Sequence, residues 1–295
     1  KNHKRSIILI GNFDGVHVGH QKLFKLANIY KKKFNLNIGV LTFEPMPKMF
    51  FNKDIKNFRI SNINQKNIIL KSLGVDFVIT QKFDKKFSKI KSDFFIKEIL
   101  SKKLEANYIF VSNNFKFGNK REGNVNQLIK NEKIYDYKII KPKPIILSKK
   151  IISSTYIRSL LEKGSLKKTN KLLGRNWSIE GMVQKGRQQG KKIGFPTCNI
   201  DIGDYVIAMP GVYAVIVKQK NSIKPLKAIA NLGYRPTFNQ KKILLEVHIF
   251  NFSGNLYNKY LSVEFLKFIR KEKKFKNVNQ LRKQIQSDLK AAKKK

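Results

Sequence analysis

The sequence predicts two domains: an α/β domain with a parallel sheet and covering helices, followed by a small antiparallel β-barrel with a terminal helix. Strand-like and helix-like segments alternate through the first half, as they do where helical crossovers join parallel strands. From Trp177 onward, short β-rich runs are separated by Gly, Pro and Asn, a pattern typical of small barrels. The length of 295 residues suits two ordinary domains, which we place at residues 1–172 and 173–295.

The first half opens with a buried strand and an amphipathic helix. Ser6–Ile10 is a short apolar run that ends at a Gly-Asn turn. His20–Lys33 carries apolar residues at helical spacing, with lysines on its other face. The later elements expected in this half are a strand over Asn37–Phe43, a helix over Ile63–Leu73, a strand over Phe77–Thr80, a helix over Asp93–Leu100 and a strand over Tyr108–Ser112.

The second half reads as successive strands, and a short helical stretch precedes it. The expected strands are Trp177–Val183, Val212–Val217, Lys227–Leu232, Leu244–Phe252 and Leu261–Ile269. No helix is expected among them until Val278–Leu289. These segments predict the antiparallel barrel and its terminal helix.

The formal net charge of +43 invites a nucleic-acid interpretation. Lysine far outnumbers arginine, however, and the lysines are spread along the whole chain, whereas nucleic-acid recognition favours the guanidinium fork. We therefore expect no specific nucleic-acid partner, although the positive field would attract small anions. No apolar run approaches the roughly 18 residues of a membrane span, so no membrane partner is expected. The single cysteine, Cys198, excludes an intrachain disulfide and fits a reducing cytoplasm.

The first group of residues that could bind a ligand or carry chemistry lies between the first strand and the first helix. A helix start at the carboxyl edge of a parallel sheet binds phosphate through its backbone N–H groups. Glycines there allow close approach, and His17 and His20 can donate hydrogen bonds to phosphate oxygens. The residues assigned to ATP or phosphate binding in this loop are Gly11, Asn12, Phe13, Asp14, Gly15 and Gly19.

The segment from Gly11 to His20 resembles the HxGH signature of the nucleotidyltransferase superfamily, and its surroundings resemble bacterial FAD synthetases. The other segments that carry this resemblance are Thr42–Pro47, Asn114–Gly118 with Arg121 and Gly123, and Ile152–Arg158. The resemblance implies a Rossmann-like nucleotidyltransferase domain that transfers AMP from ATP to FMN. Its implied residues are His17, His20 and Arg158 for catalysis, Ser154 and Thr155 for the ATP phosphates, and Asn114 and Arg121 for the flavin. The Ser-Ser-Thr run also suits a helix N-cap.

The second group lies in the β-rich half. The segment from Gly186 to Asn199 resembles the riboflavin kinase signature, with Cys198 where alanine is usual. Thr197 and Asn199 alternate along an extended segment and share one face, and their oxygens are hard ligands suited to Mg²⁺. The residues implied to bind ATP are Gly186, Arg187, Gly194 and Pro196.

Two later segments, Asn231–Phe238 and Leu245–Phe250, also resemble riboflavin kinases. By this resemblance Glu246 is the general base that accepts the proton of the ribityl hydroxyl, while Arg235 and Arg270 bind flavin. For Arg270 a surface ion pair is an equal alternative, and His248 is at least as well explained as a structural histidine. The C-terminal region from Phe265 onward resembles the part of the family that covers the flavin.

Both signatures in one chain predict a bifunctional enzyme that phosphorylates riboflavin to FMN and then adenylylates FMN to FAD. ATP, riboflavin and FMN are its expected small-molecule partners, and Mg²⁺ is its expected cofactor. One alternative is a single-activity kinase or adenylyltransferase in which the other site has decayed. A second alternative is a basic nucleic-acid-binding protein, for which tight binding would survive raised salt.

Overall fold

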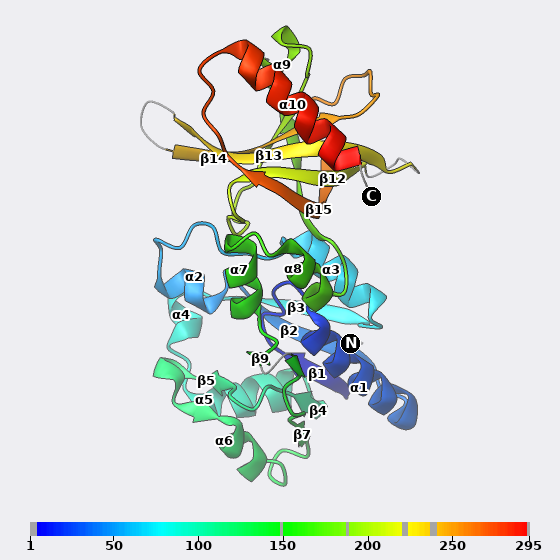
Figure 1. The fold of residues 1–295 in the computed structure, drawn as a ribbon. Coiled ribbons are helices and arrows are strands. Elements are labelled where there is room, and N and C mark those ends of the chain that lie inside the picture. Colours follow the sequence, from blue (N-terminus) through cyan, green and yellow to red (C-terminus); the bar gives the residue numbers. More distant parts are fainter. Residues whose placement is uncertain (1–4, 148–149, 187–188, 220–223, 237–240, 294–295) are drawn as a thin grey trace. The chain divides into compact units, whose positions relative to one another are not determined.

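A computed structural model describes residues 5–147, 150–186, 189–219, 224–236 and 241–293. The chain forms two compact units (Figure 1). The first consists of Lys1–Lys56 and Ile63–Ser153, and the second of Asn57–Asn62 and Ser154–Lys295. The segment Asn57–Asn62 therefore belongs by its contacts to the second unit, although its neighbours in sequence belong to the first.

The first unit is built on a five-stranded parallel sheet with the order β3-β2-β1-β4-β7. Its strands are β1 (Ser6–Ile10), β2 (Ile38–Glu44), β3 (Phe77–Lys82), β4 (Ala106–Phe110) and β7 (Lys138–Ile140). The chain runs outward from β1 through β2 to β3, and then returns to the other side of β1 to form β4. The point where the direction reverses, between β1 and β4, is where open α/β sheets bind their ligands.

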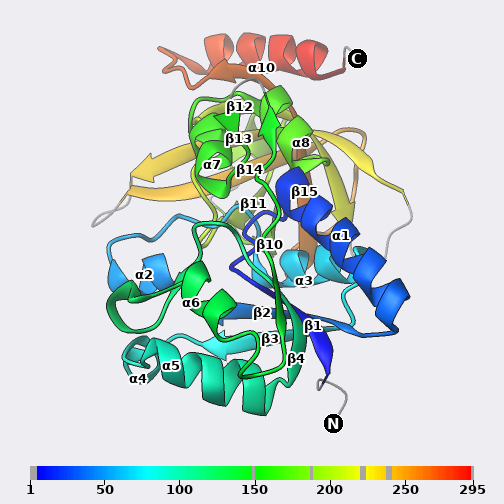
Figure 2. The same cartoon turned by 90° about the horizontal axis from the view of Figure 1, so that it is seen from below.

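Helices cover both faces of this sheet (Figure 2). On one face, α1 (Val18–Phe34) and α3 (Ile63–Ser72) form a core with strand residues such as Ile7 and Leu9. On the other face, the π-helical segment η1 (Phe95–Lys103) and α6 (Val125–Lys130) pack on Ile8 and Ile10. The central strand β1 is buried throughout, which explains why it reads as a continuous apolar run rather than an alternating one.

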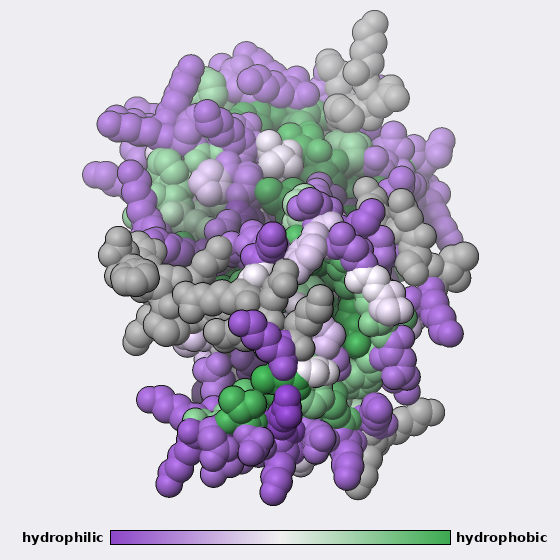
Figure 3. Space-filling model, turned by 90° about the horizontal axis from the view of Figure 1, so that it is seen from above, coloured by the Kyte–Doolittle hydropathy of each residue, from purple (hydrophilic) through white to green (hydrophobic). Residues whose placement is uncertain are grey.

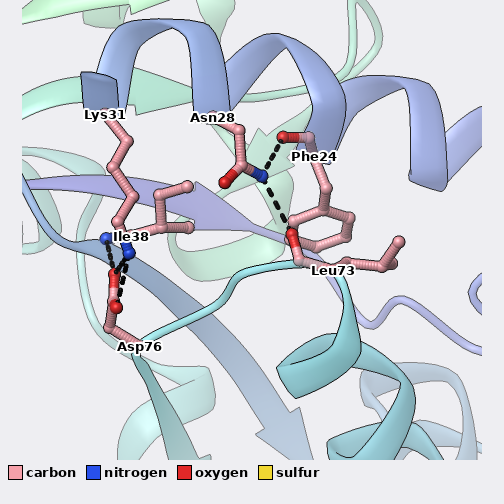
Figure 4. A network of polar contacts seen from close by, with 6 residues as sticks. All are labelled: Phe24, Asn28, Lys31, Ile38, Leu73 and Asp76. Atoms are coloured by element: carbon pink, nitrogen blue, oxygen red, sulfur yellow. Dashed lines mark hydrogen bonds and ion pairs between the residues drawn. The ribbon is translucent and has the colours of Figure 1, made fainter. Parts of the chain in front are cut away.

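Side-chain bonds fix α1 to the ends of its neighbours (Figure 4). Asn28 Nδ2 donates to the carbonyls of Phe24, at 2.8 Å, and Leu73, at 2.9 Å. Asp76 accepts the backbone N–H of Ile38 at 2.7 Å and pairs with Lys31 of α1 at 2.5 Å. These contacts join α1, the end of α3 and the start of β2 into one piece.

Several short elements complete the first unit. They are α2 (Pro47–Phe51), α4 (Lys85–Ser88), α5 (Ser92–Phe94), β5 (Lys116–Phe117), η2 (Asn119–Arg121), β6 (Gly123–Asn124), β8 (Ile146–Leu147) and β9 (Lys150–Ile151). The helix expected over Asp93–Leu100 is present as α5 followed by the π-helical η1, which extends to Lys103.

The second unit contains a closed barrel with the strand order β10-β11-β14-β13-β12-β15. Its strands are β10 (Trp177–Gln184), β11 (Cys198–Asp201), β12 (Gly211–Gln219), β13 (Leu226–Pro236), β14 (Lys241–Ile249) and β15 (Tyr260–Lys271). Its helices are α7 (Ser154–Glu162), α8 (Leu166–Leu173), α9 (Gln189–Lys192) and α10 (Val278–Lys293). All the strand pairs are antiparallel, so the predicted α/β plus β-barrel fold is confirmed.

Three details of the expected barrel were wrong. β14 ends at Ile249, whereas the sequence extended it to Phe252. Residues 198–201 were expected to be extended but were not counted among the barrel strands, of which they form one, and the short helix α9 precedes them where none was expected. Short segments of this kind carry too few side chains for a hydrophobic period to show.

No helix in the described part of the chain is both long and apolar enough to span a membrane. Figure 3 shows hydrophilic residues predominating on one face of the molecule, with hydrophobic residues visible between them. This agrees with a sequence in which lysines are scattered rather than gathered in one segment.

Candidate active sites

The first candidate site is the loop between β1 and α1, which carries the predicted phosphate-binding residues. It leaves β1 at Gly11 and enters α1 at Val18, so it lies at the carboxyl end of the central strand. The Asn114 loop follows β4, the neighbour of β1. Both loops therefore border the point where the strand order reverses, which is the expected ligand position in such a sheet.

His17 and His20 are brought together by the start of α1. His17 is the N-cap residue, and its Nδ1 accepts the backbone N–H of His20 at 3.3 Å. The two rings stack with their centroids 3.7 Å apart. Because Nδ1 of His17 accepts a hydrogen bond, the proton of the neutral ring lies on Nε2, which is then a donor. The predicted pairing of the two imidazoles is thus present.

His20 is held in its neutral form. Burial first, and then the neighbouring charge of His17, keep the pKa of His20 well below the usual histidine range. Its Nδ1 and the Oδ1 of Asn12 are buried, and neither atom has a hydrogen-bond partner among the residues described. Buried polar atoms are normally satisfied, so these two are the atoms of the loop that most need a ligand.

The backbone of the loop is strained. Phe13 and Val16 adopt positive φ angles of 47° and 38°, which are rare for such side chains. Gly15 has a φ of 76°, where glycine is free of this strain. A Cβ on Gly19 would lie 2.9 Å from the His17 ring, so glycine is needed there for that ring to pack. Strain of this kind concentrates at functional sites.

Lys66 of α3 is a residue of this site that the sequence did not reveal. Its side chain is only 4% exposed, and Nζ lies 3.0 Å from Thr42 Oγ1 and 3.4 Å from the Asn12 carbonyl oxygen. An ammonium is rarely buried to this degree. Lys66 therefore places positive charge beside the loop. The sequence alone does not distinguish it from the many other lysines of the chain.

The predicted flavin residues of the first unit lie on exposed turns. Asn114 is exposed, and its Oδ1 accepts the Ser112 hydroxyl at 2.9 Å. Arg121 is exposed at the end of η2 with a φ of 63°. The neighbouring Phe115 and Phe117 stack on each other at 5.5 Å, and Phe117 is buried in the core, so core packing accounts for that ring.

An aromatic group beyond the carboxyl ends of β2 and β3 was also missed. Phe51 is 70% exposed, and its ring contacts those of Phe50 and Phe83 at 5.2 and 5.7 Å. Phe83 in turn contacts Phe43 of β2 at 6.1 Å. An exposed ring backed by others is a surface on which a planar ligand can stack.

Ser154, Thr155 and Arg158 lie on α7, in the second compact unit. Ser154 and Thr155 occupy its first turn, where hydroxyls suit both capping and phosphate binding. Arg158 Nε donates to the Phe58 carbonyl at 2.7 Å, and its guanidinium lies 3.6 Å from the centre of the Phe58 ring. The arginine is therefore held in one orientation.

The second candidate site is a row of residues across the barrel. Asn199 of β11 and Asn231 of β13 lie opposite Glu246 of β14, one on each side. The row continues through Val212 of β12 to Arg270 of β15. All five residues line one cavity of about 720 Å³. Directly paired residues have Cβ atoms about 4.5–5.5 Å apart, so two amides flank the carboxylate.

The predicted metal ligands meet at this cavity. Thr197 and Asn199 both line it. Asn199 is 5% exposed, and its Oδ1 has no hydrogen-bond partner in the part of the chain that the structure covers. A buried oxygen acceptor of this kind fits a hard cation. Burial raises the pKa of the intervening Cys198 to about 11, so that its thiol stays protonated and unreactive.

The predicted ATP residues of this site surround the metal ligands. A Cβ on Gly186 would lie 1.6 Å from Asn199 Nδ2, so a side chain there would displace the amide. Gly194 has a φ of 87° and no atom near its Cβ position. The Pro196 carbonyl accepts a hydrogen bond from His248 Nδ1 at 2.8 Å, which is the structural role open to that histidine. Arg187 lies outside the described residues.

Arg270 is held by an ion pair, but its partner Asp288 is buried, whereas the alternative expected from the sequence was a surface pair. Its guanidinium binds Asp288 of α10 through Nε, at 2.9 and 3.0 Å, and through Nη2, at 2.7 Å. Gln284 also donates to Asp288 at 2.8 Å. The pair fixes α10 beside the cavity, which several of its side chains line. Of Arg235, the structure describes only the backbone, at the end of β13.

Comparisons with known proteins match the chain in two parts, and each part contains one of the two candidate sites. The family model described as FAD synthetase matches residues 1–156, and the model described as riboflavin kinase matches residues 173–295. A bifunctional riboflavin kinase/FMN adenylyltransferase of Buchnera aphidicola subsp. Schizaphis graminum is 39% identical over 100% of this chain and 95% of its own length. The Escherichia coli K12 protein of that name is 36% identical over 96% of this chain and 90% of its own.

A solved structure shares the whole fold. The crystal structure described as a macrolide-efflux protein from Streptococcus pneumoniae matches with a TM-score of 0.86 and 31% sequence identity. It covers 99% of this chain, and this chain covers 95% of it. The word efflux describes that protein and is not transferred to this chain. What the two share is the arrangement of strands and helices.

Proposed function

Because the chain belongs to the family of bifunctional riboflavin kinase/FMN adenylyltransferases, we propose that it phosphorylates riboflavin to FMN and then adenylylates FMN to FAD. In this proposal residues 173–295 carry the kinase reaction, and residues 1–172 carry adenylyl transfer. Both reactions consume ATP, which fits a cytoplasmic location. The observation that supports the kinase reaction most directly is the row of Asn199, Glu246 and Asn231 along one cavity.

The kinase reaction assigns the central role to Glu246. Its carboxylate accepts the proton of the terminal ribityl hydroxyl, and the hydroxyl oxygen attacks the γ-phosphorus of ATP, from which ADP leaves. The Asn199 and Asn231 amides on either side hold the polar end of the substrate near the carboxylate. Apolar side chains of α10, including Leu281 and Ile285, line the same cavity and suit the planar part of the flavin.

Magnesium fits the oxygen donors of this cavity. Asn199 Oδ1 and the Thr197 hydroxyl would hold it, together with nucleotide phosphates and water. When bound, Mg²⁺ offsets the negative charge of the transferred phosphoryl group. The buried and unpartnered Asn199 oxygen supports this assignment.

In adenylyl transfer, the loop after β1 stabilises the negative charge on the phosphate oxygens. A phosphate oxygen of FMN attacks the α-phosphorus of ATP in line, and pyrophosphate leaves. His17 and His20 donate hydrogen bonds to phosphate oxygens, Lys66 adds positive charge next to the loop, and Arg158 with the α7 hydroxyls binds the triphosphate. No covalent intermediate with the protein is needed, since orientation and electrostatics supply the acceleration.

Two groups of residues in the first unit are assigned to FMN. The exposed Phe51 ring offers a face on which the isoalloxazine stacks, and Asn114 and Arg121 supply polar contacts. Phe83, which itself contacts Phe43, supports the Phe51 ring from behind. Because Phe51→Ala removes the stacking face, it should raise the KM for FMN while leaving riboflavin phosphorylation unchanged.

Product analysis tests the proposed function. Incubation with riboflavin, ATP and Mg²⁺ should yield FMN first and FAD later, and incubation with FMN in place of riboflavin should yield FAD. A reaction that stops at FMN would establish the single-activity kinase instead. FAD formed from FMN, with no FMN formed from riboflavin, would establish the single-activity adenylyltransferase.

A further inference from the structure

The segment Asn57–Asn62 leaves the first unit and is built into the second. It lies in sequence between α2 and α3 of the first unit, yet its contacts place it with the barrel. Arg59 forms an isolated parallel bridge with Tyr205, in the turn after β11. Arg59 and Ile60 are 8% and 1% exposed, so these residues are structural rather than part of a loose connection.

Backbone and side-chain bonds hold the segment on the barrel. Asn57 Nδ2 donates to the carbonyls of Gly203, at 2.6 Å, and Tyr205, at 3.1 Å. The backbone N–H groups of Phe58 and Arg59 both donate to the Asp204 carbonyl at 2.8 Å. These bonds determine where the Phe58 ring and carbonyl lie.

Two more bonds secure the far end of the segment. The buried Trp177 Nε1 of β10 donates to the Ile60 carbonyl at 2.9 Å. Asn62 Nδ2 donates to the Tyr260 hydroxyl of β15 at 3.2 Å. The segment is thus bound at both ends to strands and turns of the barrel.

Phe58 in turn holds Arg158. The Phe58 carbonyl accepts Arg158 Nε at 2.7 Å, and the guanidinium lies 3.6 Å from the centre of the Phe58 ring. One bond fixes the Nε edge of the planar group, and the ring fixes its plane. Since a guanidinium binds phosphate through a rigid fork of donors, its orientation decides whether it meets the phosphates.

We propose that Phe58 is a positioning residue for adenylyl transfer: it orients Arg158, and the barrel that carries the kinase site orients Phe58 through Asn57. The inference rests on the proposed function, in which Arg158 binds the triphosphate. Its consequence is that adenylyl transfer depends on contacts made within the barrel unit, whereas riboflavin phosphorylation does not depend on Phe58.

Substitution of Phe58 in the full-length enzyme tests the proposal. Phe58→Leu keeps the carbonyl acceptor and removes the ring face, and it should lower kcat/KM for FMN adenylylation about five- to tenfold. Phe58→Tyr retains the ring face and should restore the activity to within twofold. Asn57→Ala should lower the same activity about two- to fivefold. Riboflavin phosphorylation, measured on the same samples, should stay unchanged and reports that the protein is folded.

A matched control comes from another phenylalanine beside a cation. Phe34 is 40% exposed at the end of α1, and Lys33 Nζ lies 5.2 Å from the centre of its ring. Phe34→Leu makes the same chemical change as Phe58→Leu without touching Arg158. It should leave both activities within twofold of the parent enzyme.

A double-mutant cycle separates positioning from a general structural effect. If Phe58 acts through Arg158, then Phe58→Leu should have no further effect on adenylylation in an Arg158→Ala background. Full additivity would overturn the proposal, as would an Arg158→Ala defect with no defect in Phe58→Leu. A normal adenylylation rate in Arg158→Ala would instead overturn the role of Arg158 in the proposed function, whatever Phe58 does.

Discussion

The Arg270–Asp288 pair is expected to be the most important single ion pair of the barrel unit. The Asp288 carboxylate is 4% exposed and receives three bonds from the guanidinium. Asp288→Asn leaves that guanidinium without its counter-charge, and breaking a buried pair in this way costs about 3–5 kcal/mol. For a unit of this size, about 3 °C per kcal/mol gives a fall of about 10 °C in its unfolding midpoint.

Thermal unfolding and kinase kinetics measure this effect together. Because α10 lines the cavity, a loosened helix should also raise the KM for riboflavin, whereas FMN adenylylation should change little. The control is Glu98→Gln, which removes a 2.8 Å ion pair with Lys102 on the surface of η1 and should cost at most about 0.5 kcal/mol.

The double replacement Arg270→Met with Asp288→Leu supplies the decisive comparison. Replacing both members of a buried pair with apolar residues is often neutral or stabilising, so the double variant should recover most of the lost midpoint. If Asp288→Asn unfolds within about 2 °C of the parent protein, or if the double variant is less stable than the single one, the ion pair does not hold α10 and this reasoning fails.

Four further outcomes follow from the two sites. Glu246→Gln should abolish FMN formation, because an amide cannot accept the ribityl proton, and should leave FAD formation from added FMN intact in the same assay. His17→Ala combined with His20→Ala should do the reverse, and a folded variant that lost both activities would show that the sites are not independent. Because the pKa of His20 is lowered in the folded state, its contribution to stability is fully present above about pH 6.5 and is lost as the pH falls toward the folded pKa. The difference in unfolding free energy between the parent protein and His20→Gln should therefore shrink between pH 7.5 and 5.5, and a constant difference would exclude this titration. Asn199→Ala should raise the Mg²⁺ concentration needed for half-maximal kinase activity, and an unchanged requirement would place the ion elsewhere.

Sequence patterns predicted both folds because each contains a repeated signal. The alternation of apolar runs and amphipathic helices in the first half has a direct physical cause in the two buried faces of a parallel sheet. The same reasoning placed the phosphate loop at the end of the first strand. The pairing of His17 with His20 followed from their spacing across the start of one helix, which is a local property of the chain.

The arrangement across the barrel could not be predicted in the same way. Period-two alternation puts Glu246 and His248 on one face of their strand, but it does not fix the register of that strand with its neighbours. The position of Asn231 beside Glu246 depends on this register. The bond between Arg270 and Asp288 depends on how α10 lies over β15, and the place of Phe58 depends on a segment that joins the other unit. These are contacts between residues distant in sequence, which no local pattern encodes.

The scarcity of acidic residues gives their positions unusual weight. The chain has 19 acidic residues against 62 basic ones, so a carboxylate on the surface meets a lysine almost anywhere, and such exposed pairs contribute little. Other carboxylates bind a backbone N–H group or a partly buried guanidinium. Asp76 accepts the Ile38 N–H at the start of a central strand, Glu122 accepts the Ser92 N–H at 2.7 Å, and Asp288 binds Arg270. In such a chain the acidic residues, rather than the abundant lysines, are where charge determines structure. The same reasoning makes Glu246, set between two amides in a cavity, more informative than the net charge about what the protein does.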